Sequence, residues 1–210
     1  MSRTTSAIDR LFRISVSNEQ RSLKLDKRKL IQAARTLLRA ERVAQAEISI
    51  ALLDDEAILQ VNLEYLNHDY PPDVLSFVLD EAGEGPPLNT GKSGSRERGA
   101  GKILSGEVLI GVDEAIRGAK KFDWPAEHEV LLYLVHGLLH ICGYDDLSPS
   151  EKKIMRSREK DILALWDLVP PYLRRTSPVK KISPKKSSPK KSSSRKSPTV
   201  SSSRKGGRSR

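Results

Sequence analysis

The sequence predicts an α+β fold: a single compact domain in which a mixed sheet packs against helices, followed by a basic tail. Three observations support this prediction. Short segments rich in Ile, Val and Leu occur between segments whose apolar residues recur at helical spacing. These two kinds of segment mix along the chain without an internal repeat. Finally, the basic residues are concentrated at the end of the chain, which predicts that the tail lies outside the domain.

The first half of the domain predicts two strands and two helices. LFRISVS (11–17) and the alternating, Ile-rich AEISIALL (46–53) are the strands. The helix between them spans about 27–42, where five apolar residues recur at helical spacing: Leu30, Ala33, Ala34, Leu37 and Leu38. Asp54 and Asp55 offer an N-cap for a second helix that runs to about Tyr65.

A second pair of strands is predicted in the middle of the chain. Pro71 and Pro72 favour an extended turn into VLSFVLD (74–80), and EVLIGV (107–112) is the next strand. Residues 81–105 hold six glycines and two prolines with little that is apolar. We therefore expect a mobile loop there.

Three helices complete the domain. The first is predicted over 114–121, and the second runs from Pro125 to Ile141. The second is apolar on nearly every face, which indicates a buried central helix. Ser148-Pro149-Ser150-Glu151 opens the last helix, which is expected to end near Leu168, before two prolines end the domain.

Charge divides the chain. Of 37 Lys and Arg, 14 fall in residues 174–210, which contain no acid. Residues 1–173 therefore carry 23 bases and 27 acids, a net charge of −4. We expect a flexible N-terminus (1–9), one folded domain (10–173) and a disordered Ser/Lys/Arg/Pro-rich tail (174–210). Such a tail would bind RNA by counterion release, with little sequence preference.

The composition also predicts the compartment. Cys142 is the one cysteine, so no intrachain disulfide framework exists. Charged residues near the N-terminus interrupt any apolar signal sequence, and no apolar run is long enough to suggest a membrane span. We expect a soluble, cytoplasmic protein that does not bind membranes.

The stretch HGLLHICGYDD (136–146) carries the main chemical signal. His136 and His140 stand four residues apart and share one helix face, so both imidazoles can meet one ion. Gly143 is the expected helix C-cap. After it, Asp145 and Asp146 are candidates for a third ligand, and Asp146 gives the pattern H-x3-H-x5-D. Three ligands and an open position are typical of a catalytic zinc site.

Two other interpretations of this stretch stay open. A pair of histidines four residues apart can arise by chance on a buried helix. The spacing also matches the H-E-x-x-H motif of metalloproteases, but Gly137 stands where that motif has its glutamate base. This departure argues against a peptidase.

Three motifs together resemble the YbeY family, bacterial endoribonucleases that mature ribosomal RNA and carry zinc on an H-G-x-L-H-x-x-G-Y-D-H motif. They are HGLLHICGYDD, LNHDYPPDVLSF (66–77) and GEVLIG (106–111). The resemblance implies one α+β domain with one catalytic Zn²⁺. It also implies a single-strand-specific endoribonuclease that processes the 3′ end of 16S ribosomal RNA late in ribosome maturation. Ribosomal RNA and the small ribosomal subunit are then the expected partners.

The chain departs from the family pattern at two positions. Asp146 replaces the third histidine; its carboxylate is also a zinc ligand, but it lowers the charge of the site by one. Leu66 stands where the family usually has an arginine, which would hold a phosphate or stabilise its transition state. The second departure concerns the binding of substrate rather than the metal.

Other polar residues have a functional and a structural interpretation. Asp73 either orients the site or caps a turn, Glu107 could reach the site, and Tyr144 either donates to a phosphate or packs. For the remaining four we favour structural roles: Ser76 alternates with core residues, His68 and His128 are surface residues, and Cys142 is a core residue.

Three functions remain in view. The first is a zinc-dependent endoribonuclease in which His136, His140 and Asp146 hold the ion as Lewis acid and water activator. The second is a zinc hydrolase of another class, and the third is a non-catalytic RNA-binding assembly factor stabilised by zinc. The sequence identifies neither the general base nor the oligomeric state, and it does not distinguish attack by water from attack by the 2′-hydroxyl of the RNA.

Overall fold

Four strands form one mixed sheet in the computed structural model, which describes residues 11–83 and 97–173. The strands are β1 (Phe12–Asn18), β2 (Gln45–Leu53), β3 (Val74–Ala82) and β4 (Ile103–Gly111). Their order is β1-β2-β4-β3. β1, β2 and β4 run parallel, whereas β3 pairs antiparallel with β4 and forms one edge of the sheet.

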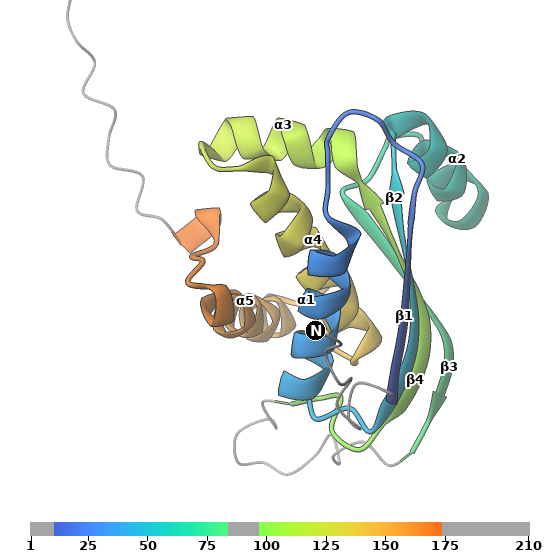
Figure 1. Cartoon of the computed structure of the whole chain (residues 1–210), viewed down its shortest axis with the longest axis vertical. Coiled ribbons are helices and arrows are strands. Elements are labelled where there is room, and N and C mark those ends of the chain that lie inside the picture. Colours follow the sequence, from blue (N-terminus) through green and yellow to red (C-terminus); the bar gives the residue numbers. More distant parts are fainter. Residues whose placement is uncertain (1–10, 84–96, 174–210) are drawn as a thin grey trace, which may run out of the picture. The chain divides into compact units, whose positions relative to one another are not determined.

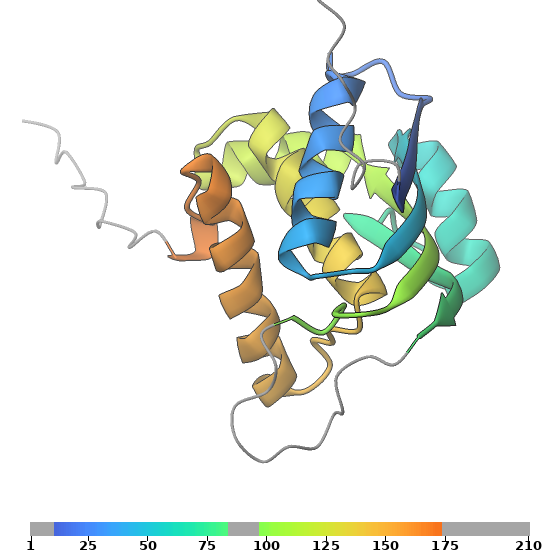
Figure 2. The ribbon, with the colours of Figure 1, turned by 60° about the horizontal axis from the view of Figure 1, so that its bottom comes forward.

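Helices cover both faces of this sheet (Figures 1 and 2). α1 and α4 pack on one face, and α2 packs on the other (Figure 1). The α-helices of the described residues are α1 (Lys27–Ala40), α2 (Asp55–Leu66), α3 (Val112–Phe122), α4 (Ala126–Ile141) and α5 (Pro149–Leu163), and two short 3₁₀ helices cover Ala164–Trp166 and Pro171–Leu173. The predicted α+β class is confirmed.

Side-chain caps define where three of the helices begin. The carboxylates of Asp26 and Asp54 accept backbone N–H bonds at the starts of α1 and α2. The Ser148 hydroxyl accepts from Glu151 N at the start of α5. Each cap satisfies one of the amide donors that a helix start leaves unpaired. The caps expected from Asp54 and Ser148 are therefore present.

The core consists of two apolar clusters, one on each side of the sheet. The larger lies between the sheet and helices α1 and α4, and it includes residues from nearly every face of α4. α4 is thus the buried central helix that its composition predicts. The smaller cluster lies beneath α2 and contains Ala51, Leu53, Ile58, Leu75 and Leu109.

Gly137 sets how closely α4 approaches the sheet. A Cβ atom at this position would lie 2.8 Å from Val108 Cγ1 and 3.1 Å from Val74 Cγ2. Glycine is therefore required for close packing of the helix against β3 and β4. Position 137 faces the core, so a glutamate at this position would not point into a catalytic cleft.

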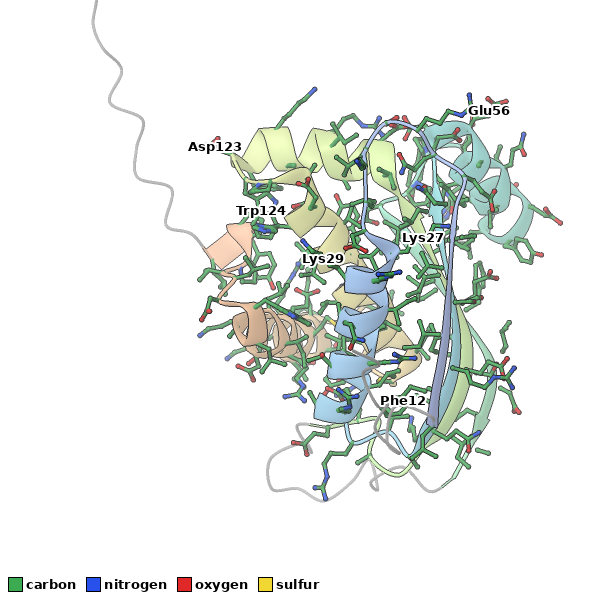
Figure 3. All side chains as sticks on the ribbon, viewed as in Figure 1. Phe12, Lys27, Lys29, Glu56, Asp123 and Trp124 are labelled. Atoms are coloured by element: carbon green, nitrogen blue, oxygen red, sulfur yellow. The ribbon has the colours of Figure 1, made fainter. Side chains whose placement is uncertain are left out.

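The junction of α3 and α4 contains a buried carboxylate. The Trp124 indole N–H, labelled in Figure 3, donates to Glu129, and the Tyr133 hydroxyl also hydrogen-bonds this carboxylate. Burial raises the pKa of Glu129, and the negative charge of Asp73 contributes to the increase. No such buried acid was expected from the apolar pattern of α4.

The expected connection between β3 and β4 and the expected end of the last helix were wrong. β3 extends to Ala82 and β4 begins at Ile103, because their backbones continue to pair, so the connection is shorter than 81–105. Residues 84–96 of it lie outside the described residues. The last helix ends at Leu163, and a 3₁₀ turn follows rather than α-helix to Leu168. Residues 1–10 and 174–210 also lie outside the described part, so the flexible N-terminus and disordered tail stay predictions.

None of the helices in the described ranges combines the length and the apolar character needed to cross a membrane.

Candidate metal centre

His136 and His140 lie on the last two turns of α4, one turn apart. Their Nε2 atoms are 3.0 Å from each other, and the planes of the two rings are nearly perpendicular. The side chains are 19% and 28% exposed, so both rings reach the surface at the end of an otherwise buried helix. The helical spacing therefore brings the two nitrogens together as predicted.

The chain turns back after α4 and brings Asp146 to the same point. Gly143 has a φ of +102°, a backbone conformation that costs glycine little, and Tyr144 N donates to Leu139 O across this turn. Asp146 Oδ1 lies 3.8 Å from His140 Nε2. One potential ligand atom from each of His136, His140 and Asp146 lies within 4.8 Å of the others.

Asp145 has a different role from Asp146. Its Oδ1 accepts hydrogen bonds from the backbone N–H groups of Asp146 at 2.7 Å and Leu147 at 3.2 Å. This carboxylate therefore stabilises the turn that presents Asp146. Of the two aspartates that the sequence left as candidates, Asp146 is the one that joins the histidines.

The outer nitrogen of each imidazole is hydrogen-bonded. His140 Nδ1 lies 3.0 Å from the Tyr144 carbonyl oxygen, and His136 Nδ1 lies 2.6 Å from Glu159 Oε1. A carbonyl oxygen can only accept, so His140 must carry its proton on Nδ1. Both contacts leave the Nε2 lone pairs directed toward the common point, the arrangement usual for histidines that bind metals.

Glu159 is completely buried and belongs to a small polar cluster. Arg156 Nη1 donates to its Oε2 at 3.1 Å, and the Tyr172 hydroxyl donates to the same oxygen. Burial alone would raise the pKa of Glu159. The hydrogen bonds from His136 and Tyr172, with the charges of His136 and Arg156, outweigh burial and lower it. The ionised form of Glu159 is therefore favoured, and its carboxylate accepts a hydrogen bond from His136 Nδ1–H.

The three potential ligand atoms are arranged in a way that favours a bound cation. Burial lowers the pKa of His140, and the nearby His136 lowers it further, so the neutral imidazole is favoured. When both imidazoles are neutral and carry their protons on Nδ1, two lone pairs face each other at 3.0 Å beside a carboxylate oxygen. A cation at this point would remove that repulsion. The cluster could therefore hold a metal ion.

Two cavities meet at His136. The first, about 410 Å³, lies along edge strand β3 and is lined by His136 and His140 together with Leu66 and Ser76. The second, about 350 Å³, lies on the side of α5 and is lined by His136 and Asp146 together with Arg156, Glu159 and Tyr172. We call them the strand cavity and the helix cavity. The candidate metal centre is thus accessible from two directions.

Two residues near the start of β3 line these cavities. Asp73 lines both cavities, and its carboxylate accepts from Val74 N at 2.9 Å, as its turn-capping interpretation expects. Ser76 lines the strand cavity, which corrects the expectation that it only alternates with core residues. The bulge in β3 comes after Ser76, between Val78 and Asp80.

The remaining candidates are structural. Tyr144 is buried, and its hydroxyl donates to the Glu41 carboxylate, so the packing interpretation holds. Cys142 is fully buried, and burial raises the pKa of its thiol well above the usual value. Glu107 lies on the sheet face opposite α4 and accepts from Ser49. His68 is exposed, whereas His128 is half-buried beside Trp124.

Sequence reasoning missed Glu159 and Arg156. A signal for Glu159 was present, because it lies on the same helical stripe as Met155 and Ile162, which are both buried. An acid on a buried stripe needs a partner, and that partner is His136. Arg156 carried no such signal, because its neighbours in space depend on where α5 docks.

Comparison with known proteins matches this domain to one family. A family model described as Endoribonuclease YbeY matches residues 15–167. The chain belongs to the YbeY family. The YbeY match includes the histidine pair, Asp146, Arg156 and Glu159.

Individual YbeY relatives match this chain over nearly their whole length. The protein named Endoribonuclease YbeY from Salinibacter ruber is 35% identical over 150 residues, which are 71% of this chain and 89% of that protein. The one from Syntrophus aciditrophicus is 33% identical, covering 72% of this chain and 88% of that protein. The one from Thermobifida fusca is 34% identical, covering 73% and 93%.

Proposed function

We propose that this protein is a zinc-dependent endoribonuclease that cuts single-stranded RNA. Membership of a family whose relatives are named endoribonucleases supports the reaction. The convergence of His136, His140 and Asp146 on one point is the observation that carries the proposal. Two imidazole nitrogens and a carboxylate oxygen are a ligand set that zinc accepts, and three protein ligands leave a position open for catalysis.

The residues of the chain have distinct roles in this reaction. His136, His140 and Asp146 hold the ion, which supplies Lewis acidity that polarises a phosphoryl oxygen and lowers the pKa of water. Glu159 and the Tyr144 carbonyl fix the two imidazole rings through their Nδ1 atoms. In the neutral imidazoles these contacts place the proton on Nδ1 and leave Nε2 free to bind the ion.

The cavities suit a nucleic-acid strand that is not base-paired. The strand cavity is open along β3, where Leu66 and Phe77 offer apolar surface to a base. Tyr65 is 64% exposed, and its ring lies 5.4 Å from that of Phe77. Unpaired bases can stack on such side chains, whereas the bases of a duplex are already stacked on each other.

We further propose that the biological substrate is the 3′ end of 16S ribosomal RNA, cut in the cytoplasm during late maturation of the small ribosomal subunit. This assignment rests on the resemblance of the three sequence motifs to their counterparts in the family. The 14 positive charges of residues 174–210 would offset the net −4 of the rest of the chain and increase affinity for RNA.

The decisive experiment is a cleavage assay on a precursor 16S ribosomal RNA fragment with the zinc-loaded full chain. We expect cleavage that is abolished by chelation, restored by zinc and absent in His136→Ala. The chemistry of the product ends, 2′,3′-cyclic phosphate or 3′-hydroxyl, then identifies the attacking group. Equal cleavage by His136→Ala would refute the proposal. Zinc-dependent RNA binding without cleavage would favour an assembly factor instead.

A further inference from the structure

The two cavities at the metal centre are poor in positive charge. Neither Leu66 nor any other residue lining the strand cavity is a lysine or arginine. In the helix cavity, Arg156 is the only such residue among the described ones. The acids Asp73, Asp146 and Glu159 line the same space, and Glu129 lies there as well. A phosphodiester that enters therefore meets one cationic side chain.

Arg156 is held firmly at the wall of the helix cavity. Its Nη1 donates to Glu159 Oε2 at 3.1 Å, and its guanidinium lies 4.2 Å from the centre of the Tyr172 ring. The hydrogen bond and the stacking contact restrict the side chain, yet the side chain stays 40% exposed. A rigid, partly exposed guanidinium loses little entropy when it binds an anion.

The hydrogen-bonding capacity of Arg156 exceeds what the protein uses. A guanidinium has five N–H donors, and the contact with Glu159 uses a donor of Nη1. The Tyr172 side chain engages the group as well, with its ring centre 4.2 Å from the guanidinium carbon, yet the 40% exposed side chain keeps further donors available. Planar pairs of N–H groups match the oxygens of a phosphate, which makes arginine a preferred ligand for phosphates.

We propose that Arg156 binds the phosphate that is cleaved, which makes it a catalytic residue rather than only the counterion of Glu159. This inference rests on the proposed endoribonuclease function. The link is short: Arg156 bonds Glu159, Glu159 bonds His136, and His136 lines both cavities. The arginine thus stands beside the metal centre, where negative charge develops on the phosphoryl oxygens during cleavage.

A structural role for Arg156 predicts a different result. If Arg156 served only to hold Glu159, its loss would loosen His136 and weaken metal binding. If it contacts the phosphate, Arg156→Ala keeps the metal but loses RNA, because Tyr172 and His136 still bond Glu159. Metal affinity and RNA affinity therefore separate the two roles.

The experiment compares the full chain with Arg156→Ala, Arg156→Lys and the control Lys153→Ala. Lys153 lies on the same helix and is exposed, and its substitution by alanine also removes one positive charge. The first measurement is cleavage of a short single-stranded RNA by zinc-loaded protein. We expect kcat/KM to fall about 10²-fold in Arg156→Ala. Arg156→Lys should lose less, because it keeps the charge without the planar fork, and Lys153→Ala should be unchanged.

The second measurement does not depend on catalysis. In the metal-free chains, a short labelled RNA strand should bind roughly tenfold more weakly to Arg156→Ala than to the wild type. Both chains carry the same tail, so the ratio of their RNA affinities reports on contacts in the helix cavity. A zinc titration should give equal affinities for the two chains.

Each outcome decides one claim. Equal RNA affinity and equal kcat/KM in Arg156→Ala would overturn the role of Arg156, as would a loss of zinc affinity that accounts for the lost activity. If the wild-type chain does not cleave RNA at all, the proposed function is wrong. The binding ratio of the metal-free chains still decides whether Arg156 contacts the phosphate.

Discussion

His136 Nδ1 lies 2.6 Å from Oε1 of Glu159, a carboxylate that has no exposed surface. The carboxylate fixes both the orientation of the ring and the position of its proton. We expect Glu159→Gln to weaken zinc binding by about 10- to 100-fold, because an amide oxygen is a weaker acceptor for the ring N–H. Isothermal titration with zinc measures this change. Asp161→Asn, which alters an exposed acid on the same helix, should keep wild-type affinity.

The three proposed ligands predict which substitutions lower the zinc content of the protein and which do not. His140→Ala and Asp146→Ala should each lower the zinc content of the purified protein, because each removes one of three ligands. Asp146→His should keep the metal, because histidine is also a zinc ligand. Elemental analysis provides the measurement. Asp145→Ala should retain more zinc than Asp146→Ala, since its carboxylate bonds the backbone of the turn. Loss of zinc from Asp145→Ala together with full zinc content in Asp146→Ala would mean that the third ligand is Asp145.

A pH-dependent change in stability is expected at Glu129. Burial raises the pKa of this carboxyl, so its contribution to stability is fully present below its unfolded pKa of about 4.5 and is lost as the pH rises through the folded value. Glu129→Gln carries no charge at any pH. The unfolding free energy of this variant relative to the wild type should therefore increase as the pH rises from about 4 to 8.

Chemical denaturation at several pH values tests this prediction. Glu127→Gln is the matched control, because Glu127 is exposed on the same helix, and its difference from the wild type should change little with pH. A constant difference between Glu129→Gln and the wild type would show that folding does not disfavour the ionised carboxylate.

Gly137→Ala should destabilise the protein by about 1–3 kcal/mol, because the added methyl group overpacks the contact with β4. The sign of the change in stability is diagnostic, since a glycine-to-alanine change inside a helix otherwise stabilises the helix by roughly 0.5–1 kcal/mol. Urea denaturation gives the value. Ser157→Ala, at an exposed position on α5, should stay within about 0.5 kcal/mol of the wild type. A Gly137→Ala variant that is more stable than the wild type would contradict the close packing.

Deleting residues 176–210 should weaken RNA binding most at low ionic strength. The deleted residues carry 12 of the 14 basic side chains of the tail, and binding through released counterions fades steeply with salt. Affinity measured against salt concentration, on ribosomal and on unrelated RNA, tests this. Equal salt slopes for the two chains would mean that the tail does not contact RNA. A shift of the cleavage site after deletion would mean that the tail contributes specificity.

The sequence predicted the parts of this structure that depend on local patterns. The spacing of His136 and His140, the glycine turn and the acid after it lie within one short segment, so helical geometry alone brings them together. Most strand and helix boundaries followed for the same reason, because caps and apolar periodicity are local.

Features that depend on docking could not be predicted in this way. Whether Ser76 faces the core or a cavity depends on how β3 lies against α4. The contacts of Glu159 and Arg156 require α5 to lie beside α4, and no spacing in the sequence specifies that arrangement. The orientation of Gly137 toward the sheet likewise becomes visible only once α4 is packed.

The candidate ligands and the acid behind them all come from residues 136–159, one continuous helix–turn–helix segment. The wall of the strand cavity comes from residues about sixty positions earlier in the chain. Bringing the candidate ligands together therefore requires only short-range chain closure, whereas forming the strand cavity requires β3 to dock beside α4. If the proposed function holds, a substitution that disrupts β3 would leave a protein that still binds zinc but does not cleave RNA. Metal content alone is thus a poor measure of how much active enzyme a preparation contains.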